Sequence, residues 1–489
     1  MITHLAARIP PLEKSRKYQL LLLTIVTFMA LILRFYKLGE WSLWIDEIFT
    51  IERVQAHYLT LEATLRNLPP QTNWIPTSLL LTSAALNLWG ISEWSARLAP
   101  ALIGVVSIPI LYFPTRQIFG MRVALISALL LAVSPWHLIW SQNARFYPAL
   151  MLFYMLALLA IFSGLERDRP WQLVAGLLFF YLALSERIFA LLLGPVVAGY
   201  LLLLWLLPFE KPAGFNRRNL LLLSLPLIAG LLIEGISWLT AGYSRFFGDF
   251  GWFFLYVNNT PARLLGTTLF NVGLPLICLA LLGGLYLLRQ KSRPGLLLLT
   301  AALLPLLLLL PVSLFMFVED RYLFVTLPAW IILGAVVVDE IWQRLGRQQL
   351  LLAVALLGVL LADAVADNLL HYQVNEGSRR DWRGAFALVQ EQAGPADTVV
   401  AFWPEFAPFY LDREIVAWDE MTPRRARETA VAGDHPIWFV VDSETVWGNL
   451  PLKSWLETNA ELIEVFYLRT PSDQSLRIYR YAPTGGGVE

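Results

Sequence analysis

Long apolar segments recur from about residue 20 to residue 370 and leave few folds open to this part of the chain. A helix that crosses a bilayer needs about 20 predominantly apolar residues. Such segments are centred near residues 27, 106, 130, 155, 179, 198, 229, 279, 305, 332 and 359. Charged residues make up only 15% of the sequence, whereas soluble proteins carry about 25%. The pattern predicts a mainly α polytopic membrane protein with about eleven transmembrane helices.

Basic residues set the expected orientation, because positive side chains gather in cytoplasmic loops. With this number of spans, the basic clusters all fall on one side of the membrane: Lys14–Lys17, Arg116 and Arg122, Arg167 and Arg169, Lys211–Arg218, Arg289–Arg293, Arg344 and Arg347. The loops on the other side carry isolated arginines. We therefore expect a multi-pass protein of the cell membrane with a cytoplasmic N-terminus and an external C-terminal region.

The predicted organisation has two parts. Residues 1–370 form the transmembrane domain, whose first external loop spans about 37–97. In that loop, residues 48–68 have helical periodicity and 77–89 are apolar but too short to span, so two juxtamembrane helices are expected. Residues 371–489 read as a helix, a Gly-Pro turn and several strands, among them "HPIWFVVDS", "AELIEVFYL" and "SLRIYRYAP". This predicts an extracytoplasmic α/β domain.

Composition excludes several classes of function. Cys278 is the single cysteine, which rules out an internal disulfide framework and a cysteine-based zinc site. The five histidines are scattered without metal-ligand spacing. A formal net charge of +0 indicates no nucleic-acid partner.

Two adjacent acids stand out in "WSLWIDEIFT", early in the first external loop. One explanation for Asp46 and Glu47 is a loop at the membrane interface, with aromatic side chains at the interface and both acids solvated. However, acids at membrane depth are costly. If the stretch opens a helix, consecutive side chains point about 100° apart. One acid then faces a cavity while the other caps the helix or pairs with an arginine, which favours a single general base over the opposed carboxylates of a glycosidase.

Three further polar clusters lie in the predicted external loops. Simpler explanations exist for each: a hairpin turn, a local salt bridge of Arg321 with Glu319 or Asp320, and neutralisation of Arg187 by its neighbour. The clusters are "WSQNARFYP" with Gln142, Arg145 and Tyr147, "FVEDRYLF" with Arg321 and Tyr322, and "SERIF" with Glu186. Arginine binds phosphate oxygens bidentately and stays charged. A carboxylate tolerates a nearby phosphate when it contacts a different group, such as an acceptor hydroxyl. The pattern suggests a reaction between a phosphate-bearing lipid donor and a hydroxyl acceptor at the outer surface of the lipid bilayer.

At these residues the sequence resembles the polytopic GT-C glycosyltransferases of the protein O-mannosyltransferase and lipid A aminoarabinose transferase type. The matching stretches are "SLWIDE", "WGISEWSARLAPALIGVVSIPILY", "SPWHLIWSQNARFYPALML", "EDRYLFVTLPAW" and "DWRGAFALVQ". The resemblance implies the GT-C fold and transfer of a sugar from a polyprenyl phosphate outside the cytoplasmic membrane. It also implies that Asp46 is the catalytic acid-base residue and Glu47 its neighbour in the motif.

Residue roles follow from the two readings together. Asp46 is expected to be the general base of an inverting displacement, with Glu47 in support. Arg145 and Arg321, with Tyr147 and Tyr322, are expected to bind the donor phosphate. Trp44, Gln142, Asn73 and Glu186 are expected to line the substrate pocket. No metal is expected to be required, although the acid pair is of a kind that binds Mg²⁺ or Mn²⁺ weakly.

The chain departs from the family pattern in two places. Many members carry His-Pro-Pro where this chain has "NWIP", Asn73–Pro76. Many also have a His or Asn followed by Tyr where Glu186 and Arg187 stand here. Both places belong to the expected site, so the sugar and the acceptor stay open.

Three alternatives to this transferase remain. A transporter or lipid flippase would place ionisable groups near the midplane, often in two repeated halves. A non-catalytic GT-C homologue would serve as a scaffold. An oligosaccharyltransferase-type enzyme would need a metal and a peptide pocket.

Overall fold

The chain forms two compact units in the computed structural model, which describes residues 16–60, 76–241, 260–344, 346–442, 450–468 and 475–482. The first unit comprises Met1–Tyr36, Thr60–Thr82 and Leu98–Ala366. The second comprises Lys37–Leu59, Ser83–Arg97 and Asp367–Glu489. Both ends of the first loop therefore belong with the C-terminal part of the chain.

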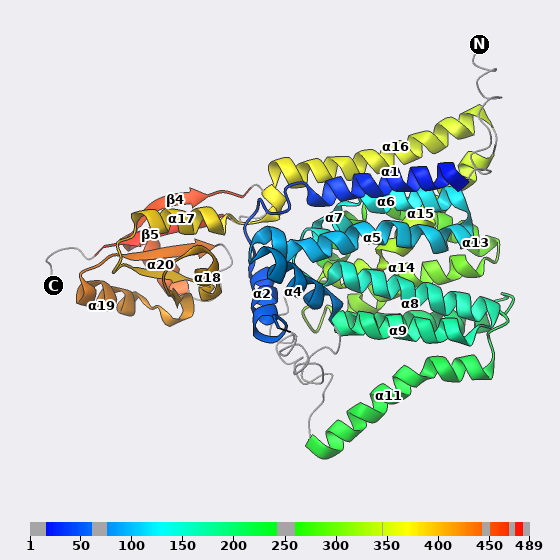
Figure 1. Ribbon diagram of the computed structural model, residues 1–489, viewed down its shortest axis with the longest axis horizontal. Coiled ribbons are helices and arrows are strands. Elements are labelled where there is room, and N and C mark those ends of the chain that lie inside the picture. The colour runs from blue at the N-terminus through cyan, green and yellow to red at the C-terminus, as the bar shows by residue number, and fades with distance from the viewer. Residues whose placement is uncertain are drawn as a thin grey trace, which may run out of the picture. The chain divides into compact units, whose positions relative to one another are not determined.

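The first unit is helical (Figure 1). Its elements are α1 (Arg16–Phe35), α5 (Glu93–Phe119), α6 (Met121–Val133), α7 (Pro135–Ser141), α8 (Tyr147–Arg167), α9 (Pro170–Glu186), η2 (Ile188–Leu192), α10 (Leu193–Leu206), α11 (Arg217–Ala241), α12 (Pro261–Val272), α13 (Leu274–Arg289), α14 (Arg293–Val312), η4 (Asp320–Thr326), α15 (Leu327–Gln343) and α16 (Arg347–Leu369). All the apolar centres predicted from the sequence fall inside these helices. Helices α5 and α16 continue into the second unit.

Seven helices in the described part of the chain are long and apolar enough to cross a membrane. Two bent helix pairs raise the number to nine if each pair is one span. The apolar helix α9 is shorter, at 17 residues. The mainly α polytopic membrane fold is thus confirmed, while the full set of about eleven spans stays a prediction.

One of the bent pairs shows how a broken span is stabilised. Helices α6 and α7 meet at 56°, because Pro135 has no N–H to continue the helical ladder. The buried guanidinium of Arg34 in α1 donates to the carbonyls of Leu131 and Ala132, at 3.2 and 2.9 Å. It also contacts Nδ1 of His137, at 2.6 Å. The carbonyls freed by the break therefore keep donors inside the apolar core.

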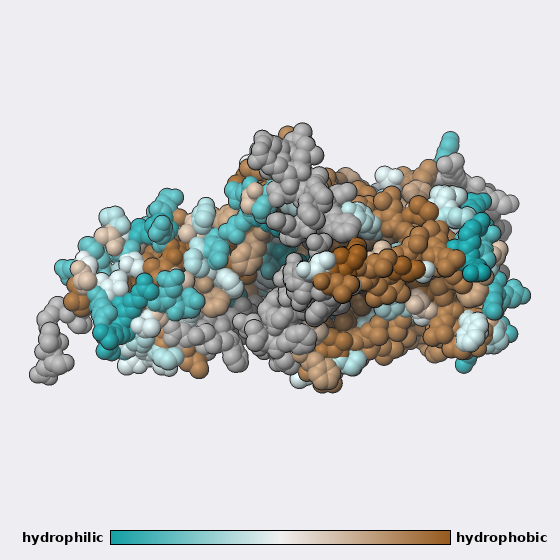
Figure 2. Space-filling view, turned by 90° about the horizontal axis from the view of Figure 1, so that it is seen from below, coloured by the Kyte–Doolittle hydropathy of each residue, from teal (hydrophilic) through white to brown (hydrophobic). Residues whose placement is uncertain are grey.

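The surface of the helical unit has the polarity of a bilayer-embedded protein. Figure 2 shows an apolar surface over the helices and a polar rim at the end of the unit where α1 begins. Three ion pairs join helix ends: Arg122–Asp339, Arg293–Glu166 and Arg218–Asp168. These pairs connect basic clusters that the sequence assigns to the cytoplasmic side.

The second unit contains a mixed five-stranded sheet of order β2-β1-β3-β5-β4. Strand β1 is parallel to β2 and β3, and β5 is antiparallel to β3 and β4. The strands are β1 (Thr398–Ala401), β2 (Ile415–Ala417), β3 (Ile437–Asp442), β4 (Glu461–Phe466) and β5 (Leu476–Tyr481). Every residue of β3 is buried, as its apolar sequence requires of a central strand. The predicted C-terminal α/β fold is confirmed.

The first loop and the C-terminal part of the chain also contain helices. The loop contributes α2 (Ile45–His57) and α4 (Thr77–Trp89), the latter crossing from the first unit into the second. The C-terminal part contributes α17 (Trp382–Gln392), α18 (Ala407–Tyr410), α19 (Pro423–Gly433) and α20 (Leu450–Asn459), with single turns η5 (Leu370–Val374), η6 (Glu376–Ser378), η7 (Pro404–Phe406) and η8 (Trp418–Glu420). Helix α4 matches the second helix expected in the loop. Helix α2 covers the first part of the other expected helix and ends at His57, and residues 61–75 lie outside the described residues.

Candidate functional site

The Glu47 side chain is fully buried and held by one arginine. Arg97 Nε and Nη2 donate to the two carboxylate oxygens of Glu47, at 2.8 and 2.7 Å. The remaining N–H groups of Arg97 donate to the carbonyls of Leu38, Trp41 and Ser42. All five guanidinium donors are therefore used. A planar, bidentate pair of this kind fixes the backbone that leads into α2.

Asp46 lies in the first turn of α2, beside this fixed pair. Its side chain is half-buried, whereas that of Glu47 is inaccessible. The Glu47 carboxylate also accepts from the backbone N–H of Trp44, at 3.3 Å, which caps the helix start. Glu47 is thus committed to structure, as the helical spacing allows for one acid of the pair. A catalytic role for Asp46 stays a prediction.

Residues of the C-terminal part complete the surroundings of the acid motif. Ser42 Oγ donates to Asp381 at 3.3 Å and accepts from the Arg383 backbone N–H at 3.0 Å. Arg383 Nε also donates to Glu93, at 3.1 Å. Sequence reasoning noted "DWRGAFALVQ" as a matching stretch but missed these contacts, because they join positions more than 280 residues apart.

Tyr410 makes a second link between the loop and the C-terminal part. Its hydroxyl accepts from the Leu43 N–H at 2.8 Å and donates to Glu93 at 2.9 Å. Burial, and then the charge of Glu93, raise the pKa of the Tyr410 phenol. The phenol therefore keeps its proton at neutral pH and serves both hydrogen bonds.

In the first unit, the structure brings together several of the predicted phosphate-binding residues. Arg145 and Arg187 both lie over the ring of Phe146, at 5.1 and 5.5 Å from its centroid. Tyr147 packs edge-on against Phe324. Tyr322 stacks on Phe189, with ring centroids 3.8 Å apart. The loops before α8, before α10 and before α15 therefore meet in one aromatic cluster that carries two guanidinium groups.

Arg321 and Glu186 have identified partners in the same unit. Arg321 forms an ion pair with Glu319, so the local salt bridge considered from the sequence does form, with Glu319 as the acid. Glu186 is buried and accepts from the Ser78 backbone N–H, at 3.0 Å, and from the Ser78 hydroxyl. Glu186 thus anchors the start of α4. A substrate-binding role for either residue stays a prediction.

Gln142 and Asn73 were also predicted to line the substrate pocket. The Gln142 amide nitrogen donates to the carbonyls of Tyr36 at 2.7 Å and Arg34 at 3.1 Å, which caps the end of α1. A role for Gln142 in binding must therefore use its Oε1 atom. Asn73 lies outside the described residues.

The acid motif, Asp46 and Glu47, belongs to the second compact unit, and the aromatic cluster around Phe146 belongs to the first. The catalytic role predicted for the motif and the phosphate-binding role predicted for Arg145, Tyr147 and Tyr322 stay predictions.

The acid pair does not fit a divalent cation. Both Glu47 oxygens are held by the Arg97 guanidinium, so the pair does not supply two carboxylate ligands, and Mg²⁺ needs several oxygens. Within the described ranges, no group of three or more His, Cys, Asp or Glu side chains is placed to hold a metal. That no metal is required stays a prediction.

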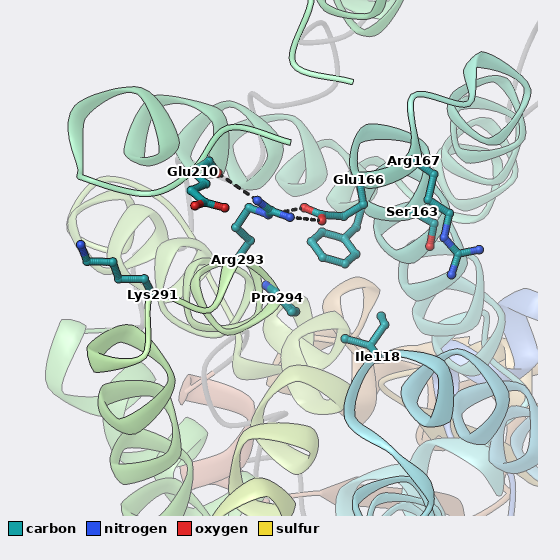
Figure 3. A pocket seen from close by; sticks show the side chains of 9 residues that line it. Ile118, Ser163, Glu166, Arg167, Glu210, Lys291, Arg293 and Pro294 are labelled. Carbon is teal, nitrogen blue, oxygen red and sulfur yellow. Dashed lines mark hydrogen bonds and ion pairs between the residues drawn. The ribbon is translucent and has the colours of Figure 1, made fainter. Parts of the chain in front are cut away.

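A hollow of about 490 Å³ lies elsewhere in the helical unit (Figure 3). It opens between the helix ends that carry Glu166 and Arg293, whose side chains form a bidentate ion pair. Arg167, Glu210 and Lys291 also line it. None of the predicted site residues does. We interpret the Glu166–Arg293 pair as a clamp between α8 and α14.

Comparison with known proteins decides the fold. Residues 69–230 match the model of the dolichyl-phosphate-mannose-protein mannosyltransferase family. ArnT from Cupriavidus metallidurans, bound to undecaprenyl phosphate, is similar in structure, with a TM-score of 0.56, 17% identity, and 95% of this chain and 99% of that chain covered. The chain has the GT-C glycosyltransferase fold.

A second solved structure is similar in fold. The oligosaccharyltransferase AglB from Archaeoglobus fulgidus, in complex with an inhibitory peptide and a dolichol-phosphate, has a TM-score of 0.56 and 14% identity, with 96% of this chain and 74% of that chain covered. Among curated proteins, none matches significantly. The resemblance seen in the sequence is confirmed, and the similar proteins are glycosyltransferases.

Proposed function

We propose that this GT-C chain transfers a sugar from a polyprenyl phosphate to a hydroxyl acceptor, a lipid, a glycan or a protein. The observation that carries the proposal is the saturated Glu47–Arg97 pair, which holds Asp46 in the first turn of α2. A buried ion pair costs desolvation energy, and here it positions one half-buried carboxylate. The polyprenyl phosphates bound by ArnT and AglB support the choice of donor.

The reaction is a direct displacement at the anomeric carbon. The acceptor oxygen attacks that carbon while Asp46 takes the hydroxyl proton as general base. The bond from the anomeric carbon to the phosphate oxygen breaks, and its electron pair leaves with the polyprenyl phosphate. The leaving phosphate gains one negative charge, which guanidinium groups stabilise. The sugar transfers with inversion of configuration.

In this proposal Arg145 and Arg321 bind the donor phosphate. Replacing either with alanine is expected to raise the KM for the polyprenyl-phosphate donor several-fold while changing the KM for the acceptor little. Steady-state kinetics with each substrate varied in turn measures the difference. Phe146→Leu tests whether the ring between Arg145 and Arg187 contributes. Equal losses toward both substrates would contradict the phosphate assignment, and absence of transfer by the unmodified protein would favour the scaffold alternative.

The site is proposed to work on the extracytoplasmic face of the cell membrane, with the N-terminus in the cytoplasm. The basic clusters joined at the polar end of the helical unit support this orientation. In sealed cells, external protease is expected to cleave after His371, with fragments identified by a C-terminal epitope. A cytoplasmic protein serves as the control for sealed membranes. Cleavage only after the cells are opened would reverse the orientation.

A further inference from the structure

Arg379 lies next to the acid motif, although it is more than 330 residues away in sequence. Its guanidinium carbon is 4.8 Å from the centroid of the Trp44 ring. Glu47, Arg97 and Asp46 are close enough to act on it electrostatically. All these residues belong to the second unit. The C-terminal part of the chain thus supplies a cation at the start of α2.

The backbone before Arg379 is shaped to deliver that side chain. Three consecutive residues, Glu376, Gly377 and Ser378, have positive φ angles of 46°, 67° and 55°. Two of them are not glycine, and a positive φ is costly for such residues. At Gly377 a Cβ atom would lie 2.3 Å from the Trp41 ring. Strain of this kind persists where the surrounding structure over-determines it, often at a functional site.

The environment of Arg379 is that of a partly desolvated cation. Burial lowers its pKa to about 10, although the charges of Glu47 and Asp46 counteract the shift. The guanidinium therefore stays charged at neutral pH. Glu47 is already neutralised by its bidentate pair with Arg97. Arg379 and Asp46 are a cation and an anion within electrostatic reach of each other at the start of α2.

The chemistry of the displacement needs such a pair. The general base and the leaving phosphate both border the anomeric carbon, so a cation that binds the phosphate together with Arg145 and Arg321 is expected within about one sugar ring of Asp46. A carboxylate alone would repel that phosphate. A guanidinium stacked on an aromatic ring is held in place by its face and binds oxyanions along its edge. Arg379 meets both requirements within the unit that contains Asp46.

We propose that Arg379 binds the phosphate of the polyprenyl donor beside Asp46. This inference rests on the proposed function, because it names a substrate contact of the same site. It also gives the C-terminal part of the chain a direct role in substrate binding. Negative charge on the phosphate rises as the sugar leaves, so the contact strengthens in the transition state.

Binding of undecaprenyl phosphate, without sugar or acceptor, tests the proposal. The full-length protein in detergent is titrated and tryptophan fluorescence records the dissociation constant. Arg379→Gln is expected to weaken binding at least tenfold, and Arg379→Lys less, because lysine keeps the charge but not the fork. Asp46→Asn should bind at least as well as the unmodified protein. Arg424→Gln, at an exposed arginine in α19, is the matched control and should leave binding unchanged.

Undecaprenol, which lacks the phosphate, separates a lost contact from a disturbed fold. Its binding should be the same in the unmodified protein and in both Arg379 variants. The proposal is overturned if folded Arg379→Gln binds undecaprenyl phosphate within twofold of the unmodified protein, or if undecaprenol binding falls equally. The titration measures binding alone, so its result holds even if the chain transfers no sugar. If a separate transfer assay finds no activity in unmodified protein that binds undecaprenyl phosphate, that result counts against the proposed function and not against the role of Arg379.

Discussion

Replacing Asp46 with asparagine is expected to lower sugar transfer by about 10²–10⁴-fold, the usual contribution of a general base. Asparagine has nearly the same shape, so α2 and the Glu47–Arg97 pair should remain intact. The measurement is the transfer rate from a polyprenyl-phosphate sugar, with melting temperature and membrane insertion recorded for each variant. The loss should appear in kcat, because the proton moves only in the transition state.

An exposed acid provides the control for this experiment. Asp412→Asn makes the same chemical change at the surface of the C-terminal part and should leave the rate unaltered. If Asp46→Asn protein is folded and transfers sugar at the normal rate, Asp46 has no part in the mechanism. Loss of both folding and transfer would instead give Asp46 a structural role.

Replacing Arg97 with methionine is expected to destabilise the second unit by about 3–5 kcal/mol, because Glu47 is left as an uncompensated buried charge. The Arg97 and Glu47 side chains are 1% and 0% exposed, so water cannot replace the lost donors without opening the loop. The carbonyls of Leu38, Trp41 and Ser42 lose their donors as well. Thermal unfolding of the detergent-solubilised protein measures the effect.

The double variant Arg97→Met with Glu47→Leu separates charge from packing. Removing both partners of a buried pair is often nearly neutral, so much of the lost stability should return. Transfer should stay low in the double variant, because the ion pair that fixes the backbone leading into α2 is then absent. A single Arg97→Met variant as stable as the unmodified protein would contradict the buried pair.

Transmembrane helices were predictable because each carries its own signal. An apolar run of about 20 residues identifies a span without reference to the rest of the chain, and the helices follow these runs. The bends between α6 and α7 and between α12 and α13 were not predicted. Pro135 and Gly273 mark the two breaks, but proline and glycine also occur in unbroken transmembrane helices.

In the C-terminal part, a strand was predictable from the sequence only where it was long enough to show a pattern. Strands β1, β3, β4 and β5 were expected from their branched and aromatic residues. Strand β2 has three residues, Ile415–Ala417, which is too short for a periodic pattern. Helices α19 and α20 were also missed.

The candidate site was only partly predictable. Asp46 and Glu47 stood out because two adjacent acids are unusual beside an apolar segment. That Glu47 pairs with Arg97, and that Arg379 stacks on Trp44, depends on contacts between distant residues. A single sequence contains no signal for such pairs.

The left-handed turn before Arg379 has a consequence for synthesis. Asp46 leaves the ribosome 333 residues before Arg379 (379 − 46), which at 5–20 residues per second is a delay of roughly 20–70 s. Until then Trp41 lacks the glycine backbone on which it rests. The segment that bears the acids is therefore among the first to be translated and among the last to mature, and it must be protected from aggregation and proteolysis in the interval.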